Sequence, residues 1–124
     1  TKTKLAEMTL RESEERFKSV FEQTAESIVL IDAETGALLE FNKRAHEDLG
    51  YTREEFEKLK VFDFGVKVSA GKITKHLQKV LVDGFDVFET KQKTKSGEIL
   101  NTQVSSKAVS INGKNCVQSI WWRY

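Results

Sequence analysis

The spacing of apolar residues changes several times along the chain. From residue 5 to residue 23 they recur every three or four positions, which predicts an amphipathic helix. Residues 28–31 and 37–41 are instead short apolar runs, separated by the turn-forming sequence Glu34-Thr35-Gly36. This part of the chain therefore predicts a helix followed by a β-hairpin. The apolar stripe of the helix contains Leu10, Phe17, Val20 and Phe21.

Helical spacing returns after the hairpin. Asn42 is expected to cap a short helix that ends at Gly50, and Thr52 and Glu55 have the spacing of a capping box that begins another. His46 lies one position beyond Ala45, so we expect it on a solvated helix face. After a linker at residues 61–66, a longer helix is predicted over residues 69–82. Its apolar stripe consists of Ile73, Leu77, Val80 and Leu81.

The last third of the chain is dominated by strand signals. Strands are predicted over residues 85–94, 99–111 and 115–124, with Asn112-Gly113 as a tight hairpin turn between the last two. Trp121 and Trp122 are neighbours in a strand, so only one of them can face the core; the other needs cover from the first helix or from a partner chain. Alternation predicts that the buried face of the middle strand contains Leu100, Thr102, Val104, Ser106 and Ala108.

Length and charge exclude several classes of function. The 124 residues suit one domain, and 20 basic against 19 acidic residues give no electrostatic sign of nucleic-acid binding. The single cysteine excludes an internal disulfide, and no apolar run is long enough to span a membrane. We therefore expect a cytoplasmic domain. Because residue 1 is Thr, we interpret the chain as a piece of a longer protein.

Motifs of catalysis are not found in the sequence. It contains no glycine-rich phosphate loop, no HExxH, no CxxC and no nucleophile elbow. The run from His46 to Leu49 superficially resembles the phosphoacceptor box of histidine kinases, but we interpret it as a solvated helix face. Glu54 and Glu55 are adjacent in a predicted helix and point about 100° apart, so they do not converge. We expect no catalytic residue and no metal site.

The order and spacing of several motifs resemble those of the PAS domain, a sensor module of signalling proteins such as sensor histidine kinases. The similarity runs from Ser13 to Trp122. It begins with the sequence SEERFKSVFEQTAESIVLIDAETGALLEFN, which is similar to the entry into the first hairpin of the family. The matching residues that follow are Asn42, Ala45, Leu49, Gly50, Tyr51, Glu54 and Glu55, and then Gly84, Phe88, Glu89, Lys95, Gly97 and Glu98.

This resemblance implies an α+β fold with a five-stranded antiparallel sheet in the order 2-1-5-4-3. Helices over one face would enclose a small pocket. Residues 1–22 would form a flanking dimerisation helix and residues 23–124 the core. Family members usually continue from the last strand into an Asp-Ile-Thr connector, whereas this chain departs from that pattern and reads IWWRY at residues 120–124.

Some family members bind flavin or haem, and the residues that hold these cofactors can be looked for in this chain. Flavin-binding members carry a reactive cysteine in the central helices, but Cys116 lies in the last predicted strand and is expected to be a buried, unreactive thiol. Haem-binding members use a histidine in the long helix, where His76 stands. His76 borders the apolar stripe beside several lysines, which is more typical of a structural histidine than of an iron ligand. We expect neither flavin nor haem.

Two hypotheses of function follow from the resemblance. In the first, the chain binds a small ligand or a partner and relays the change to an output domain outside it. In the second, it is a ligand-free interaction module with a self-filled core. We expect a homodimer formed through the stripe of the first helix. The residues expected to line a ligand pocket are Phe41, Leu49, Phe56, Ile73, His76, Leu77, Val80, Thr102, Val104 and Ser106.

Overall fold

The computed structural model describes the backbone of residues 2–64 and 70–124, and the side chains of residues 11–64 and 74–124. Helices and strands follow in the order helix, two strands, four helices, three strands. The helices are α1 (Lys2–Gln23), α2 (Lys43–Asp48), α3 (Arg53–Glu57), the 3₁₀ helix η1 (Val61–Phe64) and α4 (Ala70–Asp83). The strands are β1 (Ser27–Asp32), β2 (Leu38–Phe41), β3 (Phe85–Lys93), β4 (Ile99–Ile111) and β5 (Lys114–Arg123).

The strands form one antiparallel sheet in the order β2-β1-β5-β4-β3, as the resemblance implied. β5 joins the two hairpins by pairing with β1 on one side and β4 on the other. The β4–β5 hairpin turns at Asn112 and Gly113, whose φ angles of 51° and 76° suit a tight turn of the primed type. The two-residue turn predicted from the sequence is therefore confirmed.

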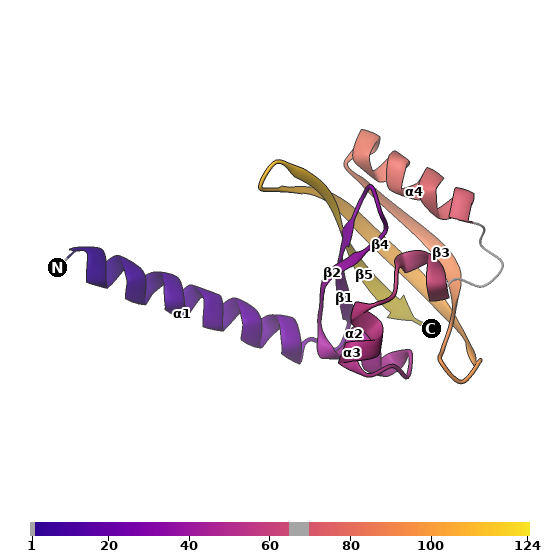
Figure 1. The fold of residues 1–124 in the computed structure, drawn as a ribbon, viewed down its shortest axis with the longest axis horizontal. Coiled ribbons are helices and arrows are strands. Elements are labelled where there is room, and N and C mark those ends of the chain that lie inside the picture. The colour runs from indigo at the N-terminus through magenta and orange to yellow at the C-terminus, as the bar shows by residue number, and fades with distance from the viewer. Residues whose placement is uncertain (1, 65–69) are drawn as a thin grey trace.

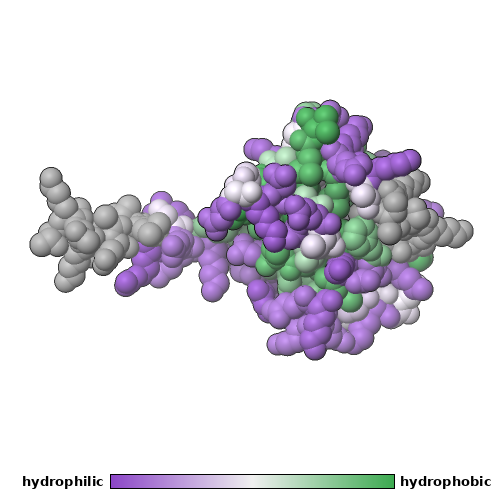
Figure 2. Space-filling model, turned by 45° about the horizontal axis from the view of Figure 1, so that its top comes forward, coloured by the Kyte–Doolittle hydropathy of each residue, from purple (hydrophilic) through white to green (hydrophobic). Residues whose placement is uncertain are grey.

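The helices lie in one layer against the sheet, except for α1 (Figure 1). α2 packs on β1, α3 on β2, and α4 on β3, β4 and β5. α1 projects away from the domain, so it does not fold back over the outer face of its own sheet (Figure 1). The described part of this helix is almost entirely hydrophilic on the face shown in Figure 2, whereas the domain body shows apolar side chains among polar ones.

A close contact fixes η1 against the first hairpin. Gly36 in the hairpin turn has a φ of 77°, and a Cβ atom there would lie 2.5 Å from the Phe62 ring. The Val61 amide also donates to the Gly36 carbonyl over 2.9 Å. Residues 61–64 are therefore a helical turn with tertiary contacts rather than the predicted linker; residues 65 and 66 of that linker lie outside the described residues.

Most other local predictions are confirmed. Asn42 caps α2, and Thr52 and Glu55 form both halves of a capping box on α3. Trp121 is 2% exposed and Trp122 61%, so the two rings do face opposite sides of the sheet. α4 agrees with the predicted helix, although Ser69 lies outside the described residues. Among the described residues, no helix is long and apolar enough to cross a bilayer.

The prediction for His46 was wrong in part. The side chain is half-buried rather than solvated, because its ring meets the edge of the Phe41 ring at a centroid distance of 6.0 Å. Its Nδ1 lies 2.9 Å from the Tyr51 carbonyl oxygen. His46 therefore helps to hold the turn between α2 and α3, a contact that helical spacing alone does not indicate.

Candidate functional site

An aromatic cluster fills the space between the short helices and one half of the sheet. Phe56 of α3 lies at its centre, with its ring centroid 4.7 Å from that of Phe41 and 5.6 Å from that of Phe64. Trp121 of β5 meets Phe64 nearly edge to face at 5.3 Å, an arrangement that aromatic rings favour. All four side chains are buried. This half of the predicted pocket is thus occupied by the side chains of the protein.

A row of polar side chains crosses the inner face of the other half of the sheet. Strand pairing sets Asp86, Ser106 and Ser119 side by side on β3, β4 and β5, and the two hydroxyl oxygens lie 2.8 Å apart. His76 reaches this row from α4. Its Nδ1 is 3.0 Å from Asp86 Oδ2 and its Nε2 is 3.4 Å from Ser106 Oγ. One hydrogen-bonded chain therefore fastens α4 to three strands.

Burial and neighbouring charges act in opposite directions on the pKa values of His76 and Asp86. Burial lowers the pKa of His76 below its ordinary value of 6.5, and the Asp86 carboxylate only partly offsets that effect. Burial acts to raise the pKa of Asp86, but the positive charge of Lys79 and the contact with His76 outweigh it, so the pKa of Asp86 is lowered. At neutral pH the arrangement is therefore an imidazole between a carboxylate and a hydroxyl, with Asp86 also 3.5 Å from the Lys79 ammonium.

The order carboxylate, imidazole, hydroxyl is also that of a hydrolase triad. Here the Ser106 side chain is buried and its hydroxyl is already bonded to Ser119. A nucleophile must reach its substrate, and the α4 helix lies over this one. The geometry thus fits a structural connection between α4 and the sheet rather than acyl transfer.

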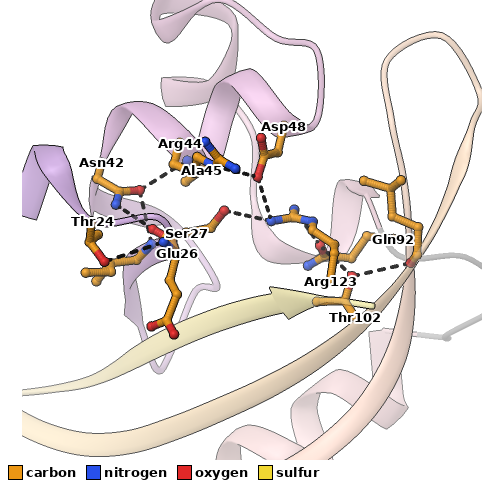
Figure 3. A network of polar contacts seen from close by, with 12 residues as sticks. Thr24, Glu26, Ser27, Asn42, Arg44, Ala45, Asp48, Gln92, Thr102 and Arg123 are labelled. Atoms are coloured by element: carbon orange, nitrogen blue, oxygen red, sulfur yellow. Dashed lines mark hydrogen bonds and ion pairs between the residues drawn. The ribbon is translucent and has the colours of Figure 1, made fainter.

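A second polar network surrounds Arg123 at the end of β5 (Figure 3). Its Nη1 lies 2.6 Å from Ser27 Oγ and 3.4 Å from Asp48 Oδ2, and its Nη2 lies 3.0 Å from Gln92 Oε1. The same amide oxygen accepts from the buried Thr102 hydroxyl over 3.3 Å. Burial lowers the pKa of Arg123, and the charge of Asp48 acts against that shift. The guanidinium thus links α2 to β1, β3 and β5.

The third network joins α1 to the domain through the buried Asn42 side chain (Figure 3). Its amide nitrogen donates to the carbonyls of Phe21 over 3.0 Å and Glu26 over 2.8 Å. Its Oδ1 accepts from the amides of Ile28 over 3.0 Å and Ala45 over 3.1 Å. One side chain therefore ties the end of α1, the start of β1 and the start of α2 together.

Two of the residues that match the family motifs, Glu55 and Lys95, are in contact between α3 and the turn that joins β3 to β4. Lys95, in the turn between β3 and β4, forms a short ion pair with Glu55 of α3, and its backbone amide donates to the Leu49 carbonyl over 2.8 Å. The hydrogen bond from Lys95 is the main reason why the pKa of Glu55 falls to about 2. The matching motifs that the sequence carries 40 residues apart thus form a clamp between the helices and the sheet.

A groove of about 370 Å³ opens where α1 meets β2 and α3. Its apolar wall includes Phe17 and Phe21, whose rings stack with centroids 5.7 Å apart. Phe17 and Val20 are each 66% exposed, and Phe21 is half-buried. Two of the three described residues of the predicted α1 stripe, Phe17 and Val20, are therefore uncovered within one chain. The groove is lined by Phe17, Lys18, Phe21, Glu22, Leu38, Leu39, Glu40, Phe41, Arg53 and Glu57.

The residues predicted to line one pocket fall into two separate clusters. Leu77 and Val80 of α4 pack against Val117 of β5, apart from the aromatic cluster. The side chains of Ile73 and of Leu10 in α1 lie outside the described residues. His76 and Ser106 belong to the polar chain, and Thr102 to the network of Arg123. The predicted residues that share the aromatic cluster are Phe41, Leu49, Phe56 and Val104.

Sequence reasoning did not single out Arg123, Asp86, Gln92 or Ser119. Each of these side chains points inward from its strand, and the alternation of inward and outward positions along β3 and β5 could have indicated that direction. Their partners could not be read from that pattern, because the register that pairs Ser119 with Ser106 is set by the sheet. The inward face of β4, by contrast, was predicted correctly: Thr102, Val104 and Ser106 are buried.

Comparison with known proteins agrees with this architecture. A family model described as PAS domain matches residues 25–121. Among curated proteins, the methyl sulfide methyltransferase-associated sensor of Methanosarcina acetivorans is 23% identical over 111 residues. That match covers 90% of this chain but only 11% of the length of the sensor.

Two solved structures are similar over nearly their whole length. The PAS domain of an HTR-like protein from Haloarcula marismortui has a TM-score of 0.87 and 24% identity, with 98% of this chain and 99% of that one covered. A domain of a sensory box sensor histidine kinase/response regulator from Geobacter sulfurreducens has a TM-score of 0.77 and 23% identity, with 90% and 95% covered. At these identities the likeness shows a shared fold.

Proposed function

The chain belongs to the PAS domain family, and from this membership we propose that it is a sensory module in which α1 pairs with a second copy and carries a change to an output region of the same protein. The relatives named as sensors and as a sensor histidine kinase/response regulator support a signalling role for the parent protein. A cytoplasmic location suits such a role. The finer claims, pairing and relay, rest on the geometry of α1.

The uncovered stripe of α1 is the main support for pairing. Phe17 and Val20 are large apolar side chains exposed on a helix that projects from the domain. An isolated helix in water gains little stability from its own hydrogen bonds and depends on burying an apolar face. A second α1 offers the same stripe, and two-fold symmetric contacts of this kind are the commonest route to a homodimer.

The connection through Asn42 supports relay. The Asn42 amide holds the Phe21 carbonyl, and the Glu22 carboxylate accepts from the Lys43 amide over 2.9 Å. The end of α1 is thus bonded to the first turn of α2 rather than joined by a free linker. A shift of α2 within the domain would therefore move α1, and a change in helix pairing would act on α2 in return.

The oligomeric state tests this proposal. We expect light scattering at micromolar concentration to give the mass of a dimer, and the double variant Phe17→Ser, Val20→Ser to give the mass of a monomer whose core still unfolds cooperatively. Glu15→Ser, on the opposite side of the same helix, is the matched control and should remain dimeric. A wild-type mass that stays monomeric up to the highest concentrations would refute pairing through α1.

Small-ligand sensing is the second candidate function, and the contacts of two buried hydroxyls weaken the argument for it. The buried hydroxyls of Thr102 and Ser106 suggested a polar ligand, but Gln92, Ser119 and His76 already bond them. We also propose that the domain carries neither haem nor flavin. His76 has a partner on each ring nitrogen, and Cys116 is buried in β5.

A further inference from the structure

The outer face of the sheet is uncovered within one chain. α2, α3 and α4 lie against the inner face, and α1 projects away from the domain (Figure 1). On the outer face, the side chain of Trp122 is 61% exposed and that of Val87 is 49% exposed. Large apolar side chains that gather on one open face mark a surface that a partner covers. The chain therefore exposes a second apolar surface besides the stripe of α1.

Strand register brings these side chains into one apolar band. Four residues of neighbouring strands lie side by side on the outer face: Ile28 of β1, Ile120 of β5, Ser105 of β4 and Val87 of β3. Trp122 lies two residues beyond Ile120 on β5, so its side chain leaves the same face next to these four. Ile28 and Ile120 are half-buried, whereas the other three are exposed. These five residues form the outer band.

A neighbouring row of the same face carries two charges of opposite sign. Its residues lie side by side in the order Glu40 of β2, Leu30 of β1, Gln118 of β5 and Lys107 of β4. Glu40 and Lys107 are exposed, and neither forms an ion pair with another described residue. The acid thus lies on one side of β5 and the base on the other. Such a surface is complementary to itself when it is rotated by half a turn about β5.

We propose that the outer faces of two copies pack against each other about a two-fold axis that runs along β5. The rotation places β4 of the second copy opposite β1, which is the neighbour of β2. Lys107 of each copy then lies beside Glu40 of the other, and the two ion pairs are equivalent by symmetry. Packed sheets are about 10 Å apart and neighbouring strands about 4.8 Å, a separation that a lysine and a glutamate side chain bridge together.

The same axis makes the sheet contact continuous with the pairing of α1. Ser27 at the start of β1 pairs with Trp121, so α1 leaves the sheet at the end where Trp122 lies. A rotation about β5 keeps that end in place, and both α1 helices therefore leave the dimer at the same end. Trp122 lies close to the axis, where its counterpart covers the indole that one chain leaves exposed. The inference rests on the proposed function, because it assigns a second surface of the same dimer.

Reversing the charges tests the contact. Analytical ultracentrifugation of the whole chain measures the dissociation constant of the dimer. We expect Lys107→Glu to raise this constant about tenfold, because two glutamates then face each other at both symmetric positions. The double variant Lys107→Glu, Glu40→Lys should restore the wild-type value, since it exchanges the two charges. Lys91→Glu makes the same change of charge near the far end of β3, and this matched control should dimerise as tightly as the wild type.

The outer band is tested by a second pair of variants. Trp122→Ser should raise the dissociation constant at least about tenfold, as truncation of an aromatic side chain at the centre of an interface does. Ile111→Ser removes an exposed apolar side chain next to the turn between β4 and β5, away from the outer band, and should leave the dissociation constant unchanged.

The outcomes separate this surface from the proposed function. A dimer that Lys107→Glu does not weaken, or that the double variant does not restore, would refute pairing of the outer faces and leave pairing through α1 intact. An equal loss in Lys91→Glu would mean that net charge alone acts, and would refute it too. If Trp122→Ser weakens the dimer but Lys107→Glu does not, a helix rather than a second sheet covers the indole. A wild-type chain that stays monomeric would overturn both proposals.

Discussion

The Asn42 side chain uses its full hydrogen-bonding capacity inside the protein. An amide group has two donors and an acceptor with two lone pairs, and Asn42 satisfies all four with backbone groups. Because those groups belong to α1, the start of β1 and α2, the residue acts as a joint as well as a helix cap. Its backbone amide also donates to the Ile28 carbonyl, which fixes the joint to the sheet.

Replacing Asn42 tests the joint. We expect Asn42→Ala to lower the free energy of unfolding by about 3 kcal/mol, since it removes a helix cap and leaves buried backbone groups without partners. Urea denaturation followed by circular dichroism measures the loss. Asn42→Asp should cost at least as much, because it keeps the two contacts of Oδ1 but sets a buried carboxyl oxygen against the carbonyl oxygens of Phe21 and Glu26.

The cap of α3 provides the control. Thr52→Ala removes one exposed capping contact, that from the Glu55 amide, and should cost about 1 kcal/mol. Equal losses for Asn42→Ala and Thr52→Ala would mean that Asn42 acts as a cap alone and contributes nothing as a joint to α1.

The element that covers the second half of the sheet, α4, is held by both apolar and polar contacts. Leu77 and Val80 bury their side chains against Val117, and His76 connects the helix to β3 and β4. The ring of Phe88 on β3 lies against the imidazole at a centroid distance of 3.7 Å. The polar half of this attachment changes with pH, whereas the apolar half does not.

We predict that the attachment weakens as the pH falls below 6.5. Since the pKa of His76 is lower in the folded protein than its ordinary value of 6.5, the unfolded chain binds the proton more readily. The stabilising contribution is therefore complete above 6.5 and is lost as the pH falls through the folded pKa. Proton NMR of the imidazole should give a midpoint below 6.5, and the unfolding free energy of His76→Asn should depend less on pH between 7 and 5.

A neighbouring charge supplies an internal control. Lys79 acts to lower the pKa of His76, so Lys79→Met should move the midpoint upward. A wild-type midpoint at or above the ordinary value would contradict the assignment of burial as the dominant effect.

Across the whole molecule, the helical layer is fastened to the sheet at both ends. His76 and Asp86 fasten α4 on one side, and the clamp of Glu55 with Lys95 joins α3 to the turn between β3 and β4 on the other. α1 stands outside this closed unit and meets it through the joint at Asn42 (Figure 1). A domain with one protruding helix that exposes the apolar side chains of Phe17 and Val20 is the arrangement on which the proposed pairing depends.

The clamp makes a measurable prediction. The carboxyl pKa of Glu55, measured by carbon NMR, should be about 2, and Lys95→Met should return it toward its ordinary value of 4.5. Because the folded pKa is the lower one, this pair stabilises the protein above pH 4.5, and its contribution is lost as the pH falls toward 2. Arg53→Met removes the exposed pair with Glu57 and should leave the pKa of Glu55 low. An ordinary pKa in the wild type would show that the clamp does not persist in solution.

The amino-acid sequence by itself determined the elements and the family. Periodicity located the helices and strands, and Asn112-Gly113 specified a hairpin. These features were predictable because they depend on residues close together in the chain. Capping of α2 by Asn42 is of the same kind, since the cap lies next to the helix it begins. The strand order is not local, and it was implied by the resemblance to the PAS family.

Only the tertiary structure decided which polar groups meet. Ser106 and Ser119 are 13 residues apart, Glu55 and Lys95 are 40 apart, and Ser27 and Arg123 are 96 apart. Their contacts depend on strand register and on how the helices sit over the sheet, and a shift of one residue would turn each inward side chain outward. The same packing divided the predicted pocket into an aromatic cluster and a polar chain, because side-chain volumes and directions are fixed only when the layers close on each other.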